Sequence, residues 1–172
     1  MSTPSLPDSV HIRDLRGTDA EALLAFETEN RAWFESHIDP RPASFYSPQG
    51  VNEHIERCLS ELALGTWHPC VIEDASGHIV GRANLKQIDA QSGTAEVGYR
   101  IAQTAAGKGL ATHALRHLIQ QAHSRWGLTG LVAYVFEENR GSQKVLARCG
   151  FGRDRLALHG EPGRERRFTL SL

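Results

Sequence analysis

The stretch most informative about the fold is TAEVGYRIAQTAAGKGLAT, residues 94–112. Its first half alternates and predicts a strand over Thr94–Ala102, and a helix is expected over Gly109–Arg125. The first turn of a helix has N–H groups without intrahelical partners and the positive end of the helix dipole, so this junction favours an anion. Gly107 and Gly109 would let a diphosphate approach the backbone amides without a Cβ in the way.

The spacing of the turn argues against two nucleotide-binding loops. A dinucleotide-binding fingerprint needs glycine or alanine three residues after Gly109, where Thr112 stands. A phosphate loop of the GxxxxGK[ST] kind needs glycine at Ala102 and serine or threonine at Gly109. The anion is therefore expected to be a diphosphate bound in some other way.

Working outward from the turn, the hydrophobic period predicts further elements on both sides. Strands are expected over Val10–Leu15, His68–Asp74, His78–Lys86, Thr129–Phe136, Arg153–Leu158 and Glu165–Leu172. Helices are expected over Thr18–Asn30, Pro48–Leu64 and Ser142–Cys149, with residues 31–47 irregular. The order predicts an α+β layered fold, a mixed and largely antiparallel sheet flanked by helices. We expect one domain over residues 1–172, with about residues 1–8 flexible.

Composition limits the class of protein. The 172 residues are 40% hydrophobic and carry a formal net charge of −1, so a basic surplus for nucleic acid is missing. The three cysteines show no CxxC spacing, which favours a reducing compartment. We find neither a signal-peptide pattern nor a ~20-residue apolar run, and expect a cytoplasmic protein that is not membrane-bound.

A second motif follows the next predicted strand: Asn139-Arg140-Gly141-Ser142, with Cys149-Gly150-Phe151 at the end of its helix. Together the two motifs resemble the GNAT acetyltransferases, and in particular those similar to the ribosomal-protein N-terminal acetyltransferases. Their pyrophosphate loop, Q/R-x-x-G-x-G/A, matches residues 106–111, except that Ala106 replaces Gln or Arg. Their N-x-x-S and GF elements match the second motif, and Ile79-Val80-Gly81 is also typical of the family.

The resemblance implies that acetyl-CoA is the acyl donor, bound without a metal. The loop and the helix start would hold the pyrophosphate, and the end of the preceding strand would hold the pantetheine arm. The second motif would orient that arm. The expected cofactor-binding residues are Arg100, Ile101, Ala102, Ala106, Gly107, Lys108, Gly109, Leu110, Ala111, Thr112, Asn139 and Ser142.

The resemblance also suggests which residues move protons. Glu96 matches the strand position at which several GNAT enzymes keep a general-base glutamate, although an exposed or salt-bridged strand glutamate fits equally. Ser142 would protonate the leaving thiolate, and its alternative role is a helix cap. Tyr134 is the competing acid, unless it serves only packing. His113 and His117 have i, i+4 spacing, but no third metal ligand is evident.

The cost of deprotonating an amine favours one class of acceptor. An α-amine, with a pKa of about 8, costs only ~1 kcal/mol to deprotonate at pH 7, against ~4.6 kcal/mol for a lysine amine. We therefore expect a protein or peptide N-terminus. A small-molecule amine and a non-catalytic acyl-CoA sensor remain the alternatives, and the chain could be a monomer or a homodimer.

The segment 31–47 is expected to border the acceptor groove. Its aromatic residues could line the groove or pack in the core: Trp33, Phe34, Phe45 and Tyr46. Its polar residues His37, Asp39 and Arg41 could contact a charge on the acceptor.

Overall fold

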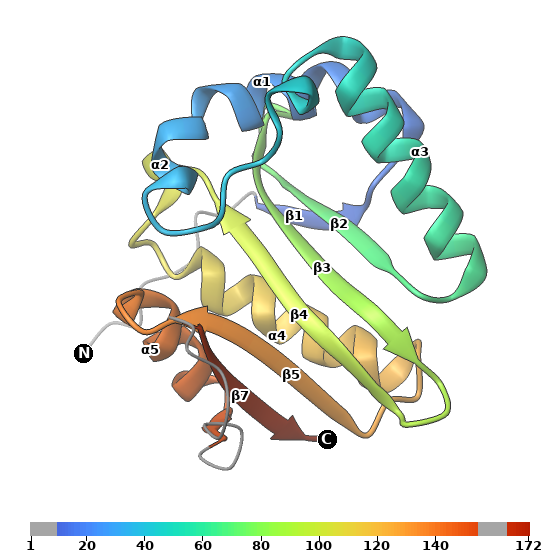
Figure 1. Cartoon of the computed structure of the whole chain (residues 1–172), viewed down its shortest axis with the longest axis vertical. Coiled ribbons are helices and arrows are strands. Elements are labelled where there is room, and N and C mark those ends of the chain that lie inside the picture. Colours follow the sequence, from blue (N-terminus) through green and yellow to red (C-terminus); the bar gives the residue numbers. More distant parts are fainter. Residues whose placement is uncertain (1–9, 155–164) are drawn as a thin grey trace.

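The computed structural model describes residues 10–154 and 165–172. A seven-stranded sheet has the order β1-β2-β3-β4-β5-β7-β6, in which only β4 and β5 pair in parallel. The α+β class and the mixed, largely antiparallel sheet are thereby confirmed (Figure 1). The strands are β1 His11–Asp14, β2 His68–Glu73, β3 Ile79–Asp89, β4 Thr94–Ile101, β5 Gly130–Phe136, β6 Gly152–Arg153 and β7 Glu165–Ser171. The helices are α1 Ala20–Glu29, α2 Arg31–Glu35, α3 Pro48–Leu64, α4 Leu110–Ser124 and α5 Arg140–Arg148.

Helices cover both faces of the sheet. Strand alternation sends Cys70 and Ala83 to the face that packs against α4 and α5, where they join a core with Leu115 and Leu146. Val71 faces the other way, into a second core with residues of α1, α2 and α3. Strand β2 is thus apolar on both faces, as expected of a strand that is covered by helices on each side.

Local sequence signals explain where α3 begins and ends. The Ser47 side chain accepts a hydrogen bond from Gly50 N at 3.0 Å, and Pro48 occupies the first helical position. Gly65 ends the helix with φ +79°, a left-handed conformation that favours glycine. Both ends agree with the expectation from sequence.

The expectation of an irregular segment at 31–47 is wrong. It contains the short helix α2 and a 3₁₀ turn over Ala43–Phe45. Phe34 is buried and its ring lies 5.4 Å from that of Phe26, so tertiary packing holds a helix too short to be stable alone.

Several boundaries also differ from the predicted ones. Strand β3 continues to Asp89, and α5 begins at Arg140 because Asn139 caps it. Of the strand predicted over Arg153–Leu158, only Arg153 lies in β6, and residues 155–158 lie outside the described residues. The expected flexible residues 1–8 lie outside them too. Within the described ranges, no helix is both long and apolar enough to cross a bilayer.

Candidate active site

A cleft opens where β4 and β5 separate. The two strands pair only from Thr94 with Gly130 to Glu96 with Val132, and then diverge (Figure 1). The resulting cavity has a volume of about 860 Å³. It is lined by both strands, by the starts of α4 and α5, and by residues of α2, α3 and β3. A cavity of this size at a break in the sheet is suited to a cofactor-sized ligand.

The glycine turn forms one wall of the cleft. Gly107 and Gly109 have φ values of +76° and +79°, and open space lies where a Cβ would project from each. Gly109 directly precedes α4, and none of the described hydrogen bonds uses the N–H of Leu110, Ala111 or Thr112 as a donor. The turn therefore presents free donors and an uncrowded backbone, which fits a pyrophosphate.

Two of the expected cofactor-binding residues do not line the cleft. Ala102 is buried against the α1 side of the sheet, and its N–H donates to Val80 O at 2.9 Å. Lys108 is exposed and does not line the cavity, although Gly107 and Gly109 on either side of it do. The other expected cofactor-binding residues all line the cleft.

Arg100 and Ile101 lie at the end of β4, where the strand borders the cleft. The Arg100 side chain forms an ion pair with the buried Glu27 at 3.3 Å, so its charge is already engaged. The Ile101 carbonyl accepts a hydrogen bond from Trp33 Nε1 at 3.1 Å. What these residues can offer to a cofactor is consequently their backbone rather than their side chains.

Ser142 lies opposite β4 and is not a helix cap. Asn139 Oδ1 caps α5 by accepting from Ser142 N at 3.2 Å. The Ser142 hydroxyl is 2.7 Å from the hydroxyl of Tyr99 on β4. Burial raises the pKa of Tyr99, which keeps that hydroxyl protonated at neutral pH. Sequence reasoning missed Tyr99, although it stands in the quoted stretch.

Tyr134 and Glu96 also line the cleft, from β5 and β4. Tyr134 is 48% exposed, so it is not a core residue. The Glu96 carboxylate forms an ion pair with Lys86 on the neighbouring strand, with 3.4 Å between the oxygen and Nζ. The Glu96 carboxylate and the Tyr99 hydroxyl thus both come from β4, from opposite faces of the strand.

The segment 31–47 is divided between the cleft and the core. Trp33, His37, Asp39 and Arg41 line the cleft, and Phe34 and Phe45 are buried in the second core. Of the aromatic residues expected there, only Trp33 reaches the cavity.

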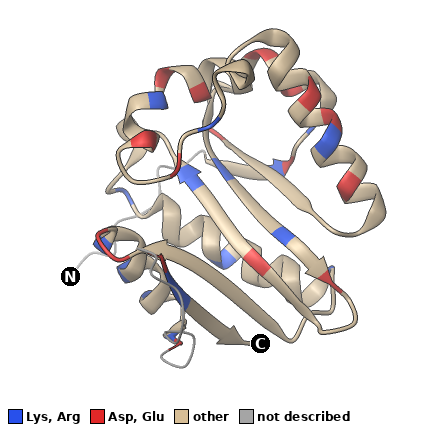
Figure 2. Ribbon diagram, viewed as in Figure 1, with Lys and Arg blue, Asp and Glu red and all other residues tan. Residues whose placement is uncertain are grey.

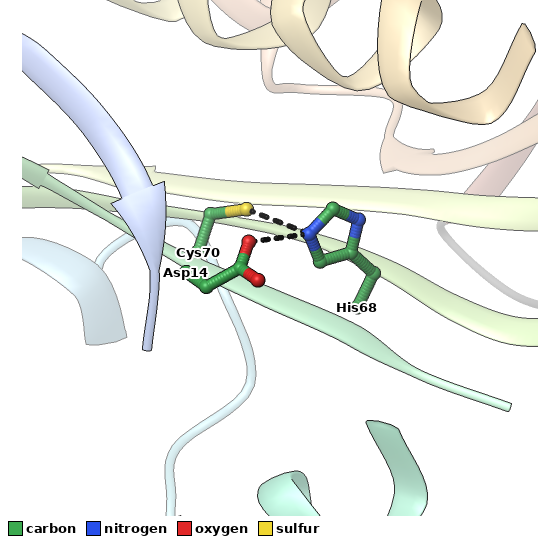
Figure 3. A group of neighbouring side chains, drawn as sticks. All are labelled: Asp14, His68 and Cys70. Carbon is green, nitrogen blue, oxygen red and sulfur yellow. Dashed lines mark hydrogen bonds and ion pairs between the residues drawn. The ribbon is translucent and has the colours of Figure 1, made fainter. Parts of the chain in front are cut away.

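A group of potential metal ligands, two of them buried, lies outside the cleft. Asp14, His68 and Cys70 come together between β1 and β2 (Figure 3). Asp14 Oδ1 and Cys70 Sγ both contact His68 Nε2, at 2.8 and 3.5 Å. Sequence reasoning missed this group, because its members are far apart and their spacing matches no ligand motif.

Contacts of this group argue for a structural role. Trp126 Nε1 donates to His68 Nδ1 at 3.0 Å, which occupies the other ring nitrogen. Arg125 Nη1 lies 3.0 Å from Asp14 Oδ2 and supplies the positive charge that a metal ion would otherwise supply. Burial would raise the pKa of Asp14, but hydrogen bonds from His68 and Arg125 lower it overall. The group therefore fastens α4 to the edge of the sheet.

His54 on α3 gives the protein a testable pH dependence. It lies in the cleft wall and its Nε2 accepts from Arg82 Nη1 at 2.8 Å. Burial, and then the charges of neighbouring arginines such as Arg82, lower its pKa to about 3. In the unfolded chain that pKa is about 6.5. Between these values only the unfolded state binds the proton, so the free energy of unfolding falls as the pH drops from 6.5.

We expect His54→Gln to remove about 2 kcal/mol of the destabilisation that the protein undergoes between pH 7 and pH 5. Glutamine keeps an acceptor for Arg82 but does not titrate. Urea unfolding at the two pH values measures the effect. His78→Gln is the control, because His78 is exposed. An identical pH dependence in wild type and His54→Gln would contradict the assignment.

Comparisons with known proteins agree with this geometry. Residues 9–152 match the model of the acetyltransferase (GNAT) domain family. The chain is 29% identical to the probable N-acetyltransferase YjcK of Bacillus subtilis, covering 87% of this chain and 83% of YjcK. The chain therefore belongs to the GNAT family and is an N-acetyltransferase of that family.

Solved structures support the same fold. The ribosomal-protein-S5-alanine acetyltransferase from Vibrio fischeri matches with a TM-score of 0.87 and 20% identity, over 95% of this chain and 93% of that one. RimL, a ribosomal L7/L12 α-N-protein acetyltransferase solved with coenzyme A, matches with a TM-score of 0.84 and 18% identity, over 99% and 98%. The expected acyl donor, acetyl-CoA, agrees with these neighbours.

Proposed function

We propose that this enzyme transfers an acetyl group from acetyl-CoA to the α-amine of a protein or peptide N-terminus. The observation that carries the proposal is the arrangement of the cleft, with the glycine turn on one wall and the Ser142–Tyr99 hydroxyl pair near it. The structural neighbours named for ribosomal-protein acetylation support the acceptor class. So does the low cost of deprotonating an α-amine at neutral pH. The three free cysteines fit a cytoplasmic enzyme.

Different residues along the cleft would bind the cofactor, position it and transfer protons. The N–H groups at the start of α4 would bind the pyrophosphate of acetyl-CoA, whose thioester supplies the acetyl group. The backbone of Arg100 and Ile101 would position the pantetheine arm. The hydroxyl pair of Ser142 and Tyr99 would give a proton to the departing sulfur, and Tyr134 is the alternative donor.

Glu96 is the proposed general base. It stands on β4 at the point where β5 begins to diverge, so it borders the space open to the acceptor amine. The ion pair with Lys86 fixes the carboxylate on that side of the strand. A carboxylate held there could take the proton of the amine directly or through one water.

Glu96→Gln should lower kcat/KM about 100-fold at pH 7, because the acceptor must then lose its proton to solvent. The loss should shrink towards pH 9, where an α-amine is already neutral. Steady-state thiol release from pH 6 to pH 9 measures both effects.

Lys86→Met is the matched control, since it breaks the same ion pair and keeps the carboxylate. It should lose far less activity than Glu96→Gln. Equal losses in the two variants, with unchanged pH profiles, would mean that Glu96 serves only the ion pair.

A further inference from the structure

The half of the cleft that faces α2 and α3 is rich in arginine. Arg41, Arg57, Arg82 and Arg100 all line it, and Figure 2 shows basic positions on both β3 and β4. Glu27 is the buried carboxylate beneath them, and it pairs with Arg41 at 3.1 Å and with Arg100 at 3.3 Å. One carboxylate thus serves two of the four arginines.

Arg82 has no such partner. It is 2% exposed, and within the described ranges no carboxylate lies at ion-pair distance from it. Its Nη1 donates to the neutral His54, and its Nε has no hydrogen-bond partner. In the sheet it lies directly opposite Arg100, another cation. A buried cation beside a like charge is unfavourable unless an anion completes the site.

Other unpaired polar atoms surround the same space. Arg41 Nε, Trp67 Nε1 and Asn84 Oδ1 are buried without a hydrogen-bond partner, and all three residues line the cleft. Buried polar groups are nearly always hydrogen-bonded, so a cluster of unpaired ones that faces a cavity indicates a ligand. Three of the four unpaired atoms, counting Arg82 Nε, are N–H donors, which suits an acceptor of hydrogen bonds.

The acidic residues in the half of the cleft that faces α2 and α3 do not cancel this charge. Glu96 is engaged by Lys86, and Asp39 is exposed at the rim. Burial, followed by the charge of Arg41, lowers the pKa of Arg100 to about 10, which still leaves it protonated at neutral pH. The inner part of the groove therefore carries a net positive charge.

We propose that this arginine pocket binds an oxyanion, a carboxylate or a phosphate, that the acceptor carries close to its amine. The proposal rests on the proposed function, because it assumes that the acceptor enters this half of the cleft. Arg82 and Lys86, which lies opposite Glu96, are four residues apart on β3, or about 13 Å. An extended peptide advances about 3.3 Å per residue, so with its amine near Glu96 it would place the side chain of its third or fourth residue near Arg82.

Peptides that share an N-terminal serine and differ at positions three and four test the pocket. At these two positions the three peptides carry Asp-Asp, Asn-Asn and phosphoserine-Asn. We expect the wild type to bind an anionic peptide at least about tenfold more tightly than the neutral one. Calorimetric titration with CoA present gives the affinities without turnover, and thiol release from acetyl-CoA gives KM. The two anionic peptides distinguish carboxylate from phosphate.

Arg82→Met should abolish the preference for the anionic peptides. Arg57→Gln is the second variant, because Arg57 is exposed on α3 and its replacement leaves the core intact. It should reduce the preference in part. Arg116→Gln, an exposed arginine on α4, is the control and should keep it.

Equal binding of neutral and anionic peptides by the wild type would overturn the proposal. So would a preference that survives in both Arg82→Met and Arg57→Gln. Failure of the proposed function has a different signature. If only the proposed function fails, anionic peptides would bind tightly through Arg82 without any peptide-dependent thiol release. If only the pocket fails, peptides would be acetylated without any preference for the anionic ones.

Discussion

Replacing Gly109 with glutamate should weaken the binding of CoA by about 100-fold or more. The glycine precedes α4 with φ +79°, and open space lies where its Cβ would project. A glutamate there would place a negative charge beside the proposed pyrophosphate site and strain the backbone that presents the N–H donors. Isothermal titration with CoA measures the affinity.

Gly77→Glu controls for the strain and the charge. Gly77 has φ +82° and equally open space, but it lies in the β2–β3 turn, outside the cleft. The two variants should lose similar thermal stability, and only Gly109→Glu should lose CoA affinity. If Gly109→Glu binds CoA as tightly as Gly77→Glu, the glycine turn does not hold the pyrophosphate.

Ser142→Ala should lower kcat by a factor of about 10²–10³, because it removes a member of the hydroxyl pair that faces the cleft. Tyr99→Phe should have a loss of the same order, and the double variant should lose little more than either one. The KM for acetyl-CoA should stay within about threefold of wild type. Steady-state kinetics with one peptide acceptor measures all four enzymes.

Asn139→Ala separates catalysis from helix capping. Asn139 Oδ1 holds the start of α5, so its loss should cost about 1 kcal/mol of stability. Ser142→Ala keeps that cap and should unfold at nearly the wild-type temperature. A Ser142→Ala enzyme with wild-type kcat and reduced stability would make the hydroxyl pair structural, and Tyr134 would become the proposed acid.

Much of the fold could be predicted from the sequence, because its signals are local. Ser47, Pro48 and Gly65 define α3 through capping and backbone conformation, and the period of two identifies the central strands. Helix α2 could not be predicted, since it depends on the burial of Phe34 against Phe26, a contact between two helices. The divergence of β4 and β5 could not be predicted either, because strand pairing is a tertiary property.

The candidate site shows the same difference between local signals, which could be predicted, and tertiary contacts, which could not. The glycine turn could be identified because the residues that give it its backbone conformation are close together in the sequence. Tyr99 was missed because its significance depends on Ser142, 43 positions away. The arginine pocket was missed for the same reason, since Arg82 and His54 come from different elements and meet only in the fold.

The most direct test of the proposed function is the release of free thiol from acetyl-CoA with a panel of short peptides and small amines, against a no-amine control. We predict peptide-dependent release, with mass spectrometry locating the acetyl group on the peptide's α-amine. Release only with small amines would contradict the peptide acceptor. Tight binding of acetyl-CoA without release for any amine would contradict the transferase itself and favour an acyl-CoA sensor.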